Sequence, residues 1–272
     1  MTLRRLAILA GMLAAFPAVA ETPWKPAGPD NILVVTTNKG RVYVELHPEI
    51  APKAVERIKL LTRRGTYDGM LFHRVIAGFV AQTGDPGNVD GGKTELPNLK
   101  PEFTFRLSNA IPHTVYAHPA GLSQGFIGAL PYVSVAETAT PKRADGTLYA
   151  WGSYCPGVMG MGRDAEHDSA NSEIFFMLGA YPAIDRDYTP LGAVLIGQDV
   201  LQALAVGEPP AQPARMIKVE VMSDMSEAPK VEVMDTASPE FATRVAAVRA
   251  ARGADFSVCD VTVPARLDGK TP

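Results

Sequence analysis

Residues 72–85 read FHRVIAGFVAQTGD, and this stretch decides how the rest of the 272-residue sequence is interpreted. Its β-branched and aromatic residues predict two short strands over 71–83, broken at Ala77-Gly78 where a glycine favours a turn. Arg74 and Gln82 stand among the apolar residues of these strands. The stretch therefore predicts a piece of β-structure that carries a cation and an amide at fixed spacing.

The residues before this stretch predict a β-hairpin followed by a helix. Alternating runs at 32–37 and 41–47 flank Asn38-Lys39-Gly40, which predicts a three-residue turn. Pro52 suits a first helical position, and apolar residues follow it at helical spacing, with Lys and Arg opposite. Gly65 can end this helix in a left-handed conformation. The helix is expected to pack one face on a sheet.

The residues after it predict further strands and few helices. A glycine-rich loop is expected over 85–93, and the lack of clear periodicity from 96 to 154 predicts a long, partly ordered excursion. Many short strands that do not alternate regularly with helices favour an antiparallel β-barrel or sandwich over a doubly wound sheet. Further strands are predicted over 158–161, 173–178, 193–196 and 216–222, and helices over 199–204 and 237–251.

The first twenty residues are interpreted as a secretory signal peptide. Arg4 and Arg5 precede an apolar run over 6–16, and small residues over 18–20 offer a cleavage site, so the mature chain would begin at Glu21. The apolar run is shorter than the ~20 residues that a membrane-spanning helix needs. No later segment is long and apolar enough, so an exported, periplasmic protein without a membrane span is expected.

The composition excludes several classes of site and partner. A net charge of -3 makes neither nucleic acid nor an anionic membrane surface an expected partner. The histidines show no metal-ligand spacing, so no metal or cofactor is predicted. Only two cysteines are present, which excludes a disulfide scaffold and a Cys-rich zinc site. In an oxidising compartment Cys155 and Cys259 could pair or remain two buried thiols, and the sequence leaves both open.

Residues 72–85 closely resemble the signature of the cyclophilins, FHRVIxGFxxQxGD. The neighbouring segments 67–69, 90–93, 168–178 and 184–192 resemble other family motifs in the same order. This resemblance, over roughly 31–222, implies a mainly β fold: a closed antiparallel eight-stranded barrel capped by two helices. The expected organisation is a signal peptide (1–20), a lead-in (21–30), a cyclophilin-like domain (31–224) with a long loop insertion at about 94–157, and a C-terminal extension (225–272).

The resemblance also implies an activity, peptidyl-prolyl cis-trans isomerisation of proline-containing polypeptides. Amide resonance holds an X-Pro bond planar behind a barrier of ~18–20 kcal/mol, and no covalent bond changes during rotation. An enzyme therefore needs to favour the twisted amide, whose prolyl nitrogen has recovered its lone pair. Arg74 matches the family's catalytic arginine, whose permanent charge and rigid donors suit that task. Gln82 matches the glutamine that grips the substrate backbone.

The other positions that match the family's substrate site include several departures from its pattern. Ala183 stands where the family has a tryptophan important for cyclosporin binding, and Glu173, where it has a glutamine, is expected to draw charge from Arg74. For Phe79 and Phe175 the alternative is a plain core role. The remaining substrate-binding positions are Phe79, Phe175 and Ile184 as walls of a proline pocket, Val80 in place of Met, Tyr188 in place of His, and Gly162-Arg163 in place of Ala-Asn.

Two other functions are weighed beside the isomerase. A module of the same fold could hold proline-containing segments as a chaperone without turnover. Gly121-Leu122-Ser123-Gln124-Gly125 also matches the nucleophile elbow of serine hydrolases, a motif that needs a strand before it and a helix after it. The flanking residues do not predict that context, so a hydrolase using Ser123 is the more distant alternative.

Overall fold

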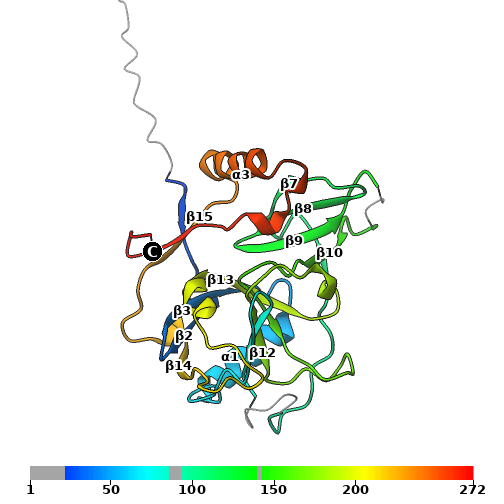
Figure 1. The fold of residues 1–272 in the computed structure, drawn as a ribbon. Helices are drawn as coiled ribbons and strands as arrows, with labels where there is room; N and C mark the ends of the chain where they lie inside the picture. The colour runs from blue at the N-terminus through cyan, green and yellow to red at the C-terminus, as the bar shows by residue number, and fades with distance from the viewer. Residues whose placement is uncertain (1–21, 86–92, 140–142, 272) are drawn as a thin grey trace, which may run out of the picture.

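A computed structural model describes residues 22–85, 93–139 and 143–271 of the chain (Figure 1). The signal peptide predicted over 1–20 lies outside these residues, as does most of the loop predicted over 85–93. The described residues form a curled eight-stranded sheet, a five-stranded sheet and a three-stranded sheet. Three α-helices accompany them, which confirms a mainly β fold with few helices.

The eight-stranded sheet carries the signature residues at one of its ends. Its order is β14-β2-β3-β13-β11-β12-β5-β4, so the ladder ends at β14 and β4. Near these edges Val75 and Gly207 exchange backbone hydrogen bonds of 2.9 Å, but such contacts are isolated bridges. The closed barrel that was predicted is therefore not confirmed, and the sheet is a curled one. Its strands are β2 (Ile32–Thr37), β3 (Gly40–Leu46), β4 (Arg74–Ile76), β5 (Val80–Thr83), β11 (Val158–Met161), β12 (Ile174–Met177), β13 (Pro190–Ile196) and β14 (Met216–Val221).

The β2–β3 hairpin shows the predicted alternation with a shorter turn. Thr37 pairs with Gly40, which leaves Asn38 and Lys39 as a two-residue turn in place of the predicted three. The Thr37 hydroxyl accepts a hydrogen bond from the Lys39 N–H at 3.0 Å and tightens that turn. Alternate side chains of the hairpin enter one apolar cluster: Leu33, Val35, Val42, Val44 and Leu46.

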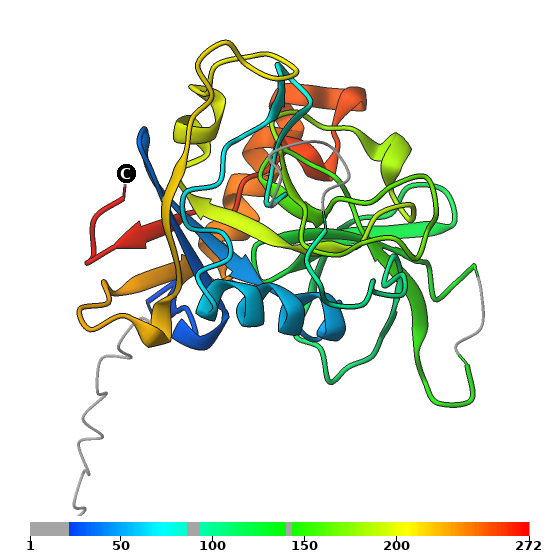
Figure 2. The same cartoon turned by 90° about the horizontal axis from the view of Figure 1, so that it is seen from below.

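Helix α1 (Pro52–Arg63) covers one face of this sheet, and Figure 2 shows it lying against the strands. Its residues Val55, Ile58 and Leu61 are buried in the same cluster as the hairpin. The Glu102 carboxylate accepts hydrogen bonds from the Lys53 and Ala54 N–H groups at 3.1 and 2.9 Å, which satisfies exposed donors where the helix dipole favours a negative charge. The second helix, α2 (Gln198–Gln202), is shorter than predicted and buries Leu201.

The insertion is a folded sheet, which corrects the prediction of a long loop at about 94–157. Its strands pair in the order β6-β10-β9-β8-β7. The sequence shows no clear strand periodicity here for three reasons. β9 is buried on both faces, it contains Pro131, a residue that argues against a strand, and a bulge shifts the register between Val115 and Ala117. The strands are β6 (Phe105–Leu107), β7 (Thr114–Ala117), β8 (Leu122–Ile127), β9 (Leu130–Val135) and β10 (Leu148–Gly152).

The C-terminal extension packs on this second sheet. Its helix α3 (Pro239–Arg252) lies beside strands β7 and β8 (Figure 1). It buries Phe241, whose ring meets those of Tyr116 and Phe126 at 5.4 and 5.5 Å. The helix predicted over 237–251 is thus present, and it contacts the insertion. The extension also supplies β15 (Val231–Met234) and β16 (Ala265–Leu267), and β15 pairs with the N-terminal strand β1 (Trp24–Pro26). The short 3₁₀ turns are Pro29–Asn31, Pro182–Ile184, Met222–Asp224, Gly253–Asp255 and Val258–Asp260.

The turn between β8 and β9 joins the insertion to the large sheet through buried polar groups. The Glu45 carboxylate accepts a hydrogen bond of 2.8 Å from the Ala129 N–H. It lies 3.4 Å from His47, whose other ring nitrogen is 2.7 Å from Glu49. A Cβ at Gly128 would stand 2.5 Å from the same carboxylate, so only glycine permits this close approach. The insertion is therefore fixed to strand β3.

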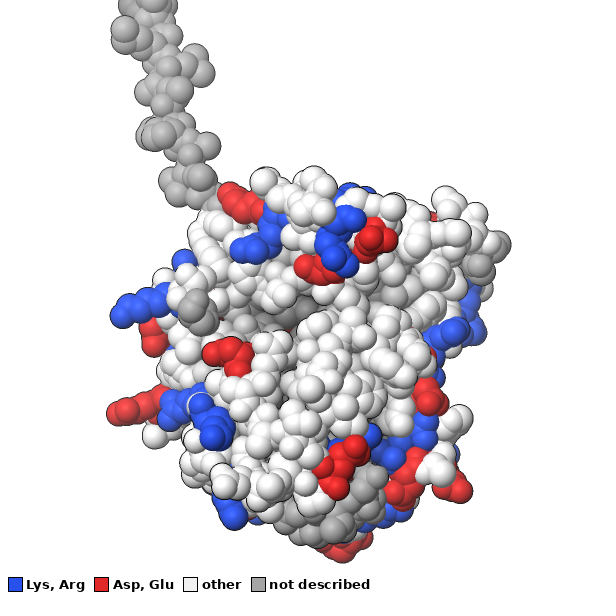
Figure 3. Space-filling view, viewed as in Figure 1, with Lys and Arg blue, Asp and Glu red and all other residues white. Residues whose placement is uncertain are grey.

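The surface is mixed in charge. On the face in Figure 3, lysines and arginines lie interspersed with acidic residues around a largely uncharged centre. Among the described residues, no helix is both long and apolar enough to cross a bilayer.

Candidate active site

Three neighbouring strands bring the signature residues together in one row. Gln82 on β5 lies directly opposite Arg74 on β4 and, on its other side, opposite Phe175 on β12. Gly160 on β11 continues the row beyond Phe175. A Cβ at Gly160 would stand 2.5 Å from the Phe175 ring, so the missing side chain leaves room for that ring. The strand register alone therefore sets a cation, an amide and an aromatic ring side by side.

The row opens into a pocket of about 250 Å³. Nine of the ten residues predicted for the site line it, and Glu173 does not. Ile184 comes from the turn 182–184, where Ala183 beside it is exposed. The lining is Arg74, Phe79, Val80, Gln82, Gly162, Arg163, Phe175, Ile184 and Tyr188.

The apolar wall is built from aromatic contacts that hold the rings in place. The Phe175 ring meets the Tyr188 ring edge-on at 5.6 Å and tilts against Tyr154 at the same distance. Phe79 packs against the exposed ring of Tyr181 at 4.8 Å. Such pairs restrict ring rotation and preserve the shape of the wall. Phe175 is thus both a buried core residue and a pocket residue, so the two alternatives weighed for it are compatible.

A chain of hydrogen bonds fixes the polar side of the pocket. Arg74 Nη1 donates to Gln82 Oε1 at 2.7 Å, and Gln82 Nε2 donates to Glu173 Oε1 at 2.6 Å. The same Glu173 oxygen lies 3.1 Å from His73 Nε2. Because a guanidinium only donates and a carboxylate only accepts, the amide of Gln82 has one possible orientation between them. Glu173 lies behind Gln82 and reaches Arg74 only through that amide.

A second carboxylate, which the sequence reasoning missed, contacts Arg74 directly. Glu208 Oε2 accepts a hydrogen bond of 2.6 Å from Arg74 Nε. Glu208 lies 134 residues further along the chain, in the connection between α2 and β14, and no local motif marks it. The contact depends on the backbone bridge between Val75 and Gly207, which sets their neighbours Arg74 and Glu208 opposite one another. The carboxylate that contacts Arg74 directly is therefore Glu208, whereas Glu173 contacts Gln82.

Arg163 lies in the lining, but its guanidinium is held by the protein. It donates to the Asp187 and Asp164 carbonyls at 3.0 and 2.9 Å and pairs with the Asp187 carboxylate at 2.8 Å. Its charged carbon lies 4.5 Å from the centre of the Tyr188 ring. These contacts position Tyr188 and leave Arg163 as a structural cation of the pocket wall.

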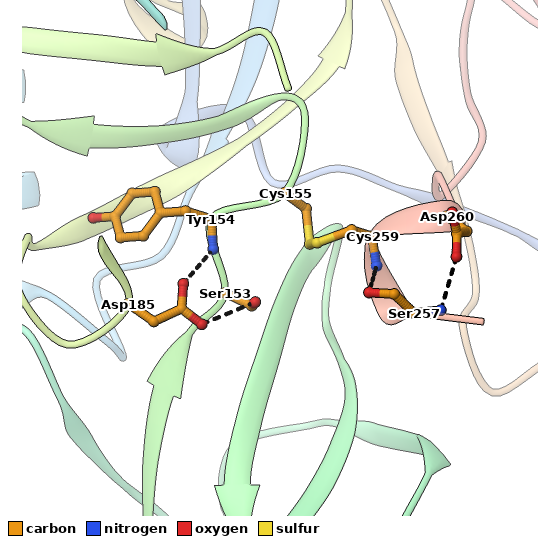
Figure 4. The surroundings of a disulfide bond; sticks show 7 residues. All are labelled: Ser153, Tyr154, Cys155, Asp185, Ser257, Cys259 and Asp260. Atoms are coloured by element: carbon orange, nitrogen blue, oxygen red, sulfur yellow. Dashed lines mark hydrogen bonds between the residues drawn. A yellow bond between two sulfur atoms is a disulfide. The ribbon is translucent and has the colours of Figure 1, made fainter. Parts of the chain in front are cut away.

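The segment that carries Tyr154, whose ring contacts Phe175, is joined to the C-terminal extension by a disulfide. Cys155 and Cys259 form this bond, with Cα atoms 4.8 Å apart, and Figure 4 shows it next to Tyr154. Asp185, next to Ile184, accepts from the Tyr154 N–H at 2.8 Å and from the Ser153 hydroxyl at 3.1 Å. The segment that carries Tyr154 is therefore anchored on both sides.

The structure does not support a hydrolase centred on Ser123. Ser123 lies within strand β8 and pairs with Ser134 on β9, so no helix follows it as a nucleophile elbow requires. Its hydroxyl lies 3.3 Å from His118 Nδ1, which satisfies a nearly buried side chain. Among the described residues, no group of three or more His, Cys, Asp or Glu side chains is placed to hold a metal ion.

Comparison with known proteins agrees with the geometry of the site. The model of the family "Cyclophilin type peptidyl-prolyl cis-trans isomerase/CLD" matches residues 32–222. A probable peptidyl-prolyl cis-trans isomerase of Brucella suis biovar 1 is 29% identical over 240 residues, which are 82% of this chain and 99% of the relative. The crystal structure of cyclophilin AquaCyp293 from Hirschia baltica has a TM-score of 0.81 and 32% identity, covering 90% of this chain and 93% of that one.

The likeness to the Hirschia structure covers more of the chain than residues 32–222 alone, so it includes residues outside the family segment. The family segment itself contains the whole row of Arg74, Gln82 and Phe175. This chain belongs to the cyclophilin family and is a peptidyl-prolyl cis-trans isomerase.

Proposed function

We propose that this isomerase acts through Arg74, which stabilises the twisted X-Pro amide, and that its substrates are exported proteins. The observation that carries the first part is the row Arg74–Gln82–Phe175 across three adjacent strands, which lines a pocket of about 250 Å³. The pocket joins an apolar wall, suited to a prolyl ring, to a fixed cation.

The chemistry needs a donor that prefers the twisted amide. When the peptide bond rotates, the prolyl nitrogen becomes pyramidal and regains a lone pair, which can then accept a hydrogen bond. Arg74 is held by Gln82 and Glu208, so its guanidinium is oriented before the substrate binds. A donor that is already oriented costs little reorganisation when the amide twists. Phe79, Val80, Phe175, Ile184 and Tyr188 would hold the prolyl ring.

Glu173 is proposed to orient Gln82 and not to bind substrate. Its buried carboxylate accepts from the Gln82 amide and lies behind the lining of the pocket. The Gln82 carbonyl is thereby turned toward Arg74. Gly162 packs close to this carboxylate, because a Cβ there would stand 2.6 Å from Glu173.

Export is proposed from the sequence over residues 1–20, whose basic start, apolar run and small-residue site fit a signal peptide. Mass spectrometry of the protein from a cell-envelope fraction should find a chain that begins at Glu21. A chain that begins at Met1 in the cytosol would contradict export and leave the isomerase mechanism untouched.

The test of the mechanism is Arg74→Ala, measured by exchange NMR on a short X-Pro peptide. Loss of one preorganised donor of this kind typically lowers a rate by ~10²–10³. The catalysed exchange at saturating peptide should fall by about that factor, while peptide affinity changes little because the donor acts mainly in the twisted state. Arg74→Lys should restore little, since an ammonium lacks the planar fork of donors.

Circular dichroism serves as the folding control for these variants. If folded Arg74→Ala exchanged the peptide at the wild-type rate, the mechanism would be wrong although the family assignment would stand. If the wild-type protein bound the peptide without accelerating exchange, the chain would be a binding module on an isomerase fold.

A further inference from the structure

Glu208 is placed beside Arg74 by the backbone and not by chance contact of two long side chains. Val75 and Gly207 exchange two backbone hydrogen bonds of 2.9 Å in an antiparallel bridge. Arg74, which precedes Val75, therefore lies opposite Glu208, which follows Gly207. A Cβ at Gly207 would stand 2.5 Å from Pro210, which restricts this position to glycine. Pro209 and Pro210 follow Glu208 and limit its backbone.

The two hydrogen bonds of Arg74 leave a defined part of the guanidinium for a substrate. A guanidinium has five N–H donors in a fixed plane. Glu208 takes the one on Nε and Gln82 takes one on Nη1. Among the described residues none accepts a hydrogen bond from Nη2. Two contacts at different nitrogens fix the plane of the group, whereas one contact would allow it to rotate.

We infer that Glu208 is a positioning residue for the isomerase reaction: it holds the guanidinium of Arg74 in the plane that directs Nη2 at the twisted amide. This inference rests on the proposed role of Arg74. Glu208 itself need not touch the substrate. Its side chain is 56% exposed and that of Arg74 is 28% exposed, so water screens the pair.

The screening decides which of two opposite effects prevails. A carboxylate beside Arg74 withdraws part of its positive charge from the substrate, and it also restrains the rotation of the guanidinium. Because the pair is partly exposed, solvent weakens the electrostatic effect of Glu208 on the charge of Arg74. The restraint on the rotation of the guanidinium is geometric, and solvent does not weaken it. Removal of Glu208 should therefore slow the reaction and not accelerate it.

The experiment compares Glu208→Ala, Glu208→Gln and Glu95→Ala with the wild type. Glutamine keeps an oxygen that can accept from Arg74 Nε without the charge. Glu95→Ala is the matched control, because Glu95 forms an exposed pair with Arg64 at 3.2 Å and does not line the pocket. Exchange NMR gives the catalysed rate at saturating X-Pro peptide, and a titration gives the affinity. The heteronuclear NOE of the Arg74 Nε–H reports its order in the free protein.

Glu208→Ala should lower the saturated rate about 3- to 5-fold, which is the upper part of the range that exposed ion pairs span. Peptide affinity should change less than about 2-fold, because the ground-state pocket is intact. Glu208→Gln should keep at least half of the wild-type rate, and Glu95→Ala all of it. The Arg74 NOE should fall in the alanine variant and largely recover with glutamine.

An unchanged rate in Glu208→Ala would overturn the inference, as would an increase. So would an unchanged Arg74 NOE. If Arg74→Ala proved as active as the wild type, the proposed mechanism would fail, and the NOE would still decide whether Glu208 orders the guanidinium.

Discussion

The disulfide between Cys155 and Cys259 should contribute a large part of the stability of this protein. The bond joins residues 104 apart in the sequence. In the chain-entropy account, a crosslink across a loop of about this length removes ~4.7 kcal/mol of conformational freedom from the unfolded chain. Loss of a native disulfide costs about 2–5 kcal/mol in practice. We expect the double variant Cys155→Ala/Cys259→Ala to lose at least ~2 kcal/mol of unfolding free energy.

The assay is urea unfolding of the double variant and the wild type, each with and without reductant. Trp24 lies in β1 and Trp151 in β10, so tryptophan fluorescence reports the terminal sheet and the insertion, which the disulfide ties together. Circular dichroism follows the whole chain, and coincident curves from the two probes justify a two-state free energy. Reductant should destabilise the wild type and leave the variant unchanged.

A loss below ~1 kcal/mol in the double variant would refute this reasoning, because the unfolded chain would then gain too little freedom for the loop-closure account. The single variant Cys155→Ala should match the double one, since either change opens the loop.

Three further outcomes are expected. Burial alone would lower the pKa of His47, but the hydrogen bonds and charges of Glu45 and Glu49 raise this pKa to about 9. The protonated histidine therefore contributes its full stabilisation below about pH 6.5 and loses it as the pH rises through 9. The urea midpoint of the wild type should fall over that pH range, and it should fall less in His47→Gln. Phe175→Ala should lower the free energy of unfolding by ~3–5 kcal/mol and should also weaken peptide binding, because the ring is both buried and part of the pocket wall. A variant that binds the peptide with wild-type affinity in a titration would contradict the place of Phe175 in that wall. Cyclosporin should inhibit poorly because Ala183 lacks the large apolar ring and the N–H donor of a tryptophan. Nanomolar inhibition of peptide exchange would show that a tryptophan at position 183 is not needed for cyclosporin binding.

The residues around the pocket could be predicted from the sequence because they lie in long motifs with fixed spacing. Arg74 and Gln82 are eight residues apart in one hairpin, and Phe175 lies in a second motif that pairs with it. A strand register carries such spacing directly into space. The residues named from the resemblance therefore lie together around one pocket, including positions where this chain departs from the family pattern, and their roles toward substrate stay predictions.

The parts that sequence reasoning missed depend on contacts between distant segments. Glu208 reaches Arg74 through a single backbone bridge, for which no local pattern exists. A loop was expected in place of the five-stranded sheet because β9 is buried on both faces and contains Pro131, a residue that argues against a strand. The closed barrel was expected from family likeness, whereas the strand ladder ends at β14 and β4. Each of these features is set by tertiary packing, which overrides local propensity.

The pairing of β1 with β15 has a consequence for when this chain can fold. Trp24 lies opposite Met234, so the first strand of the described structure waits for a partner that is synthesised some two hundred residues later. β2 likewise waits for β14, and Cys155 for Cys259. A growing chain therefore exposes strand edges and an unpaired thiol until nearly all of it has been synthesised. Such late, long-range closure slows folding and leaves apolar surface open to aggregation until the last strands are in place.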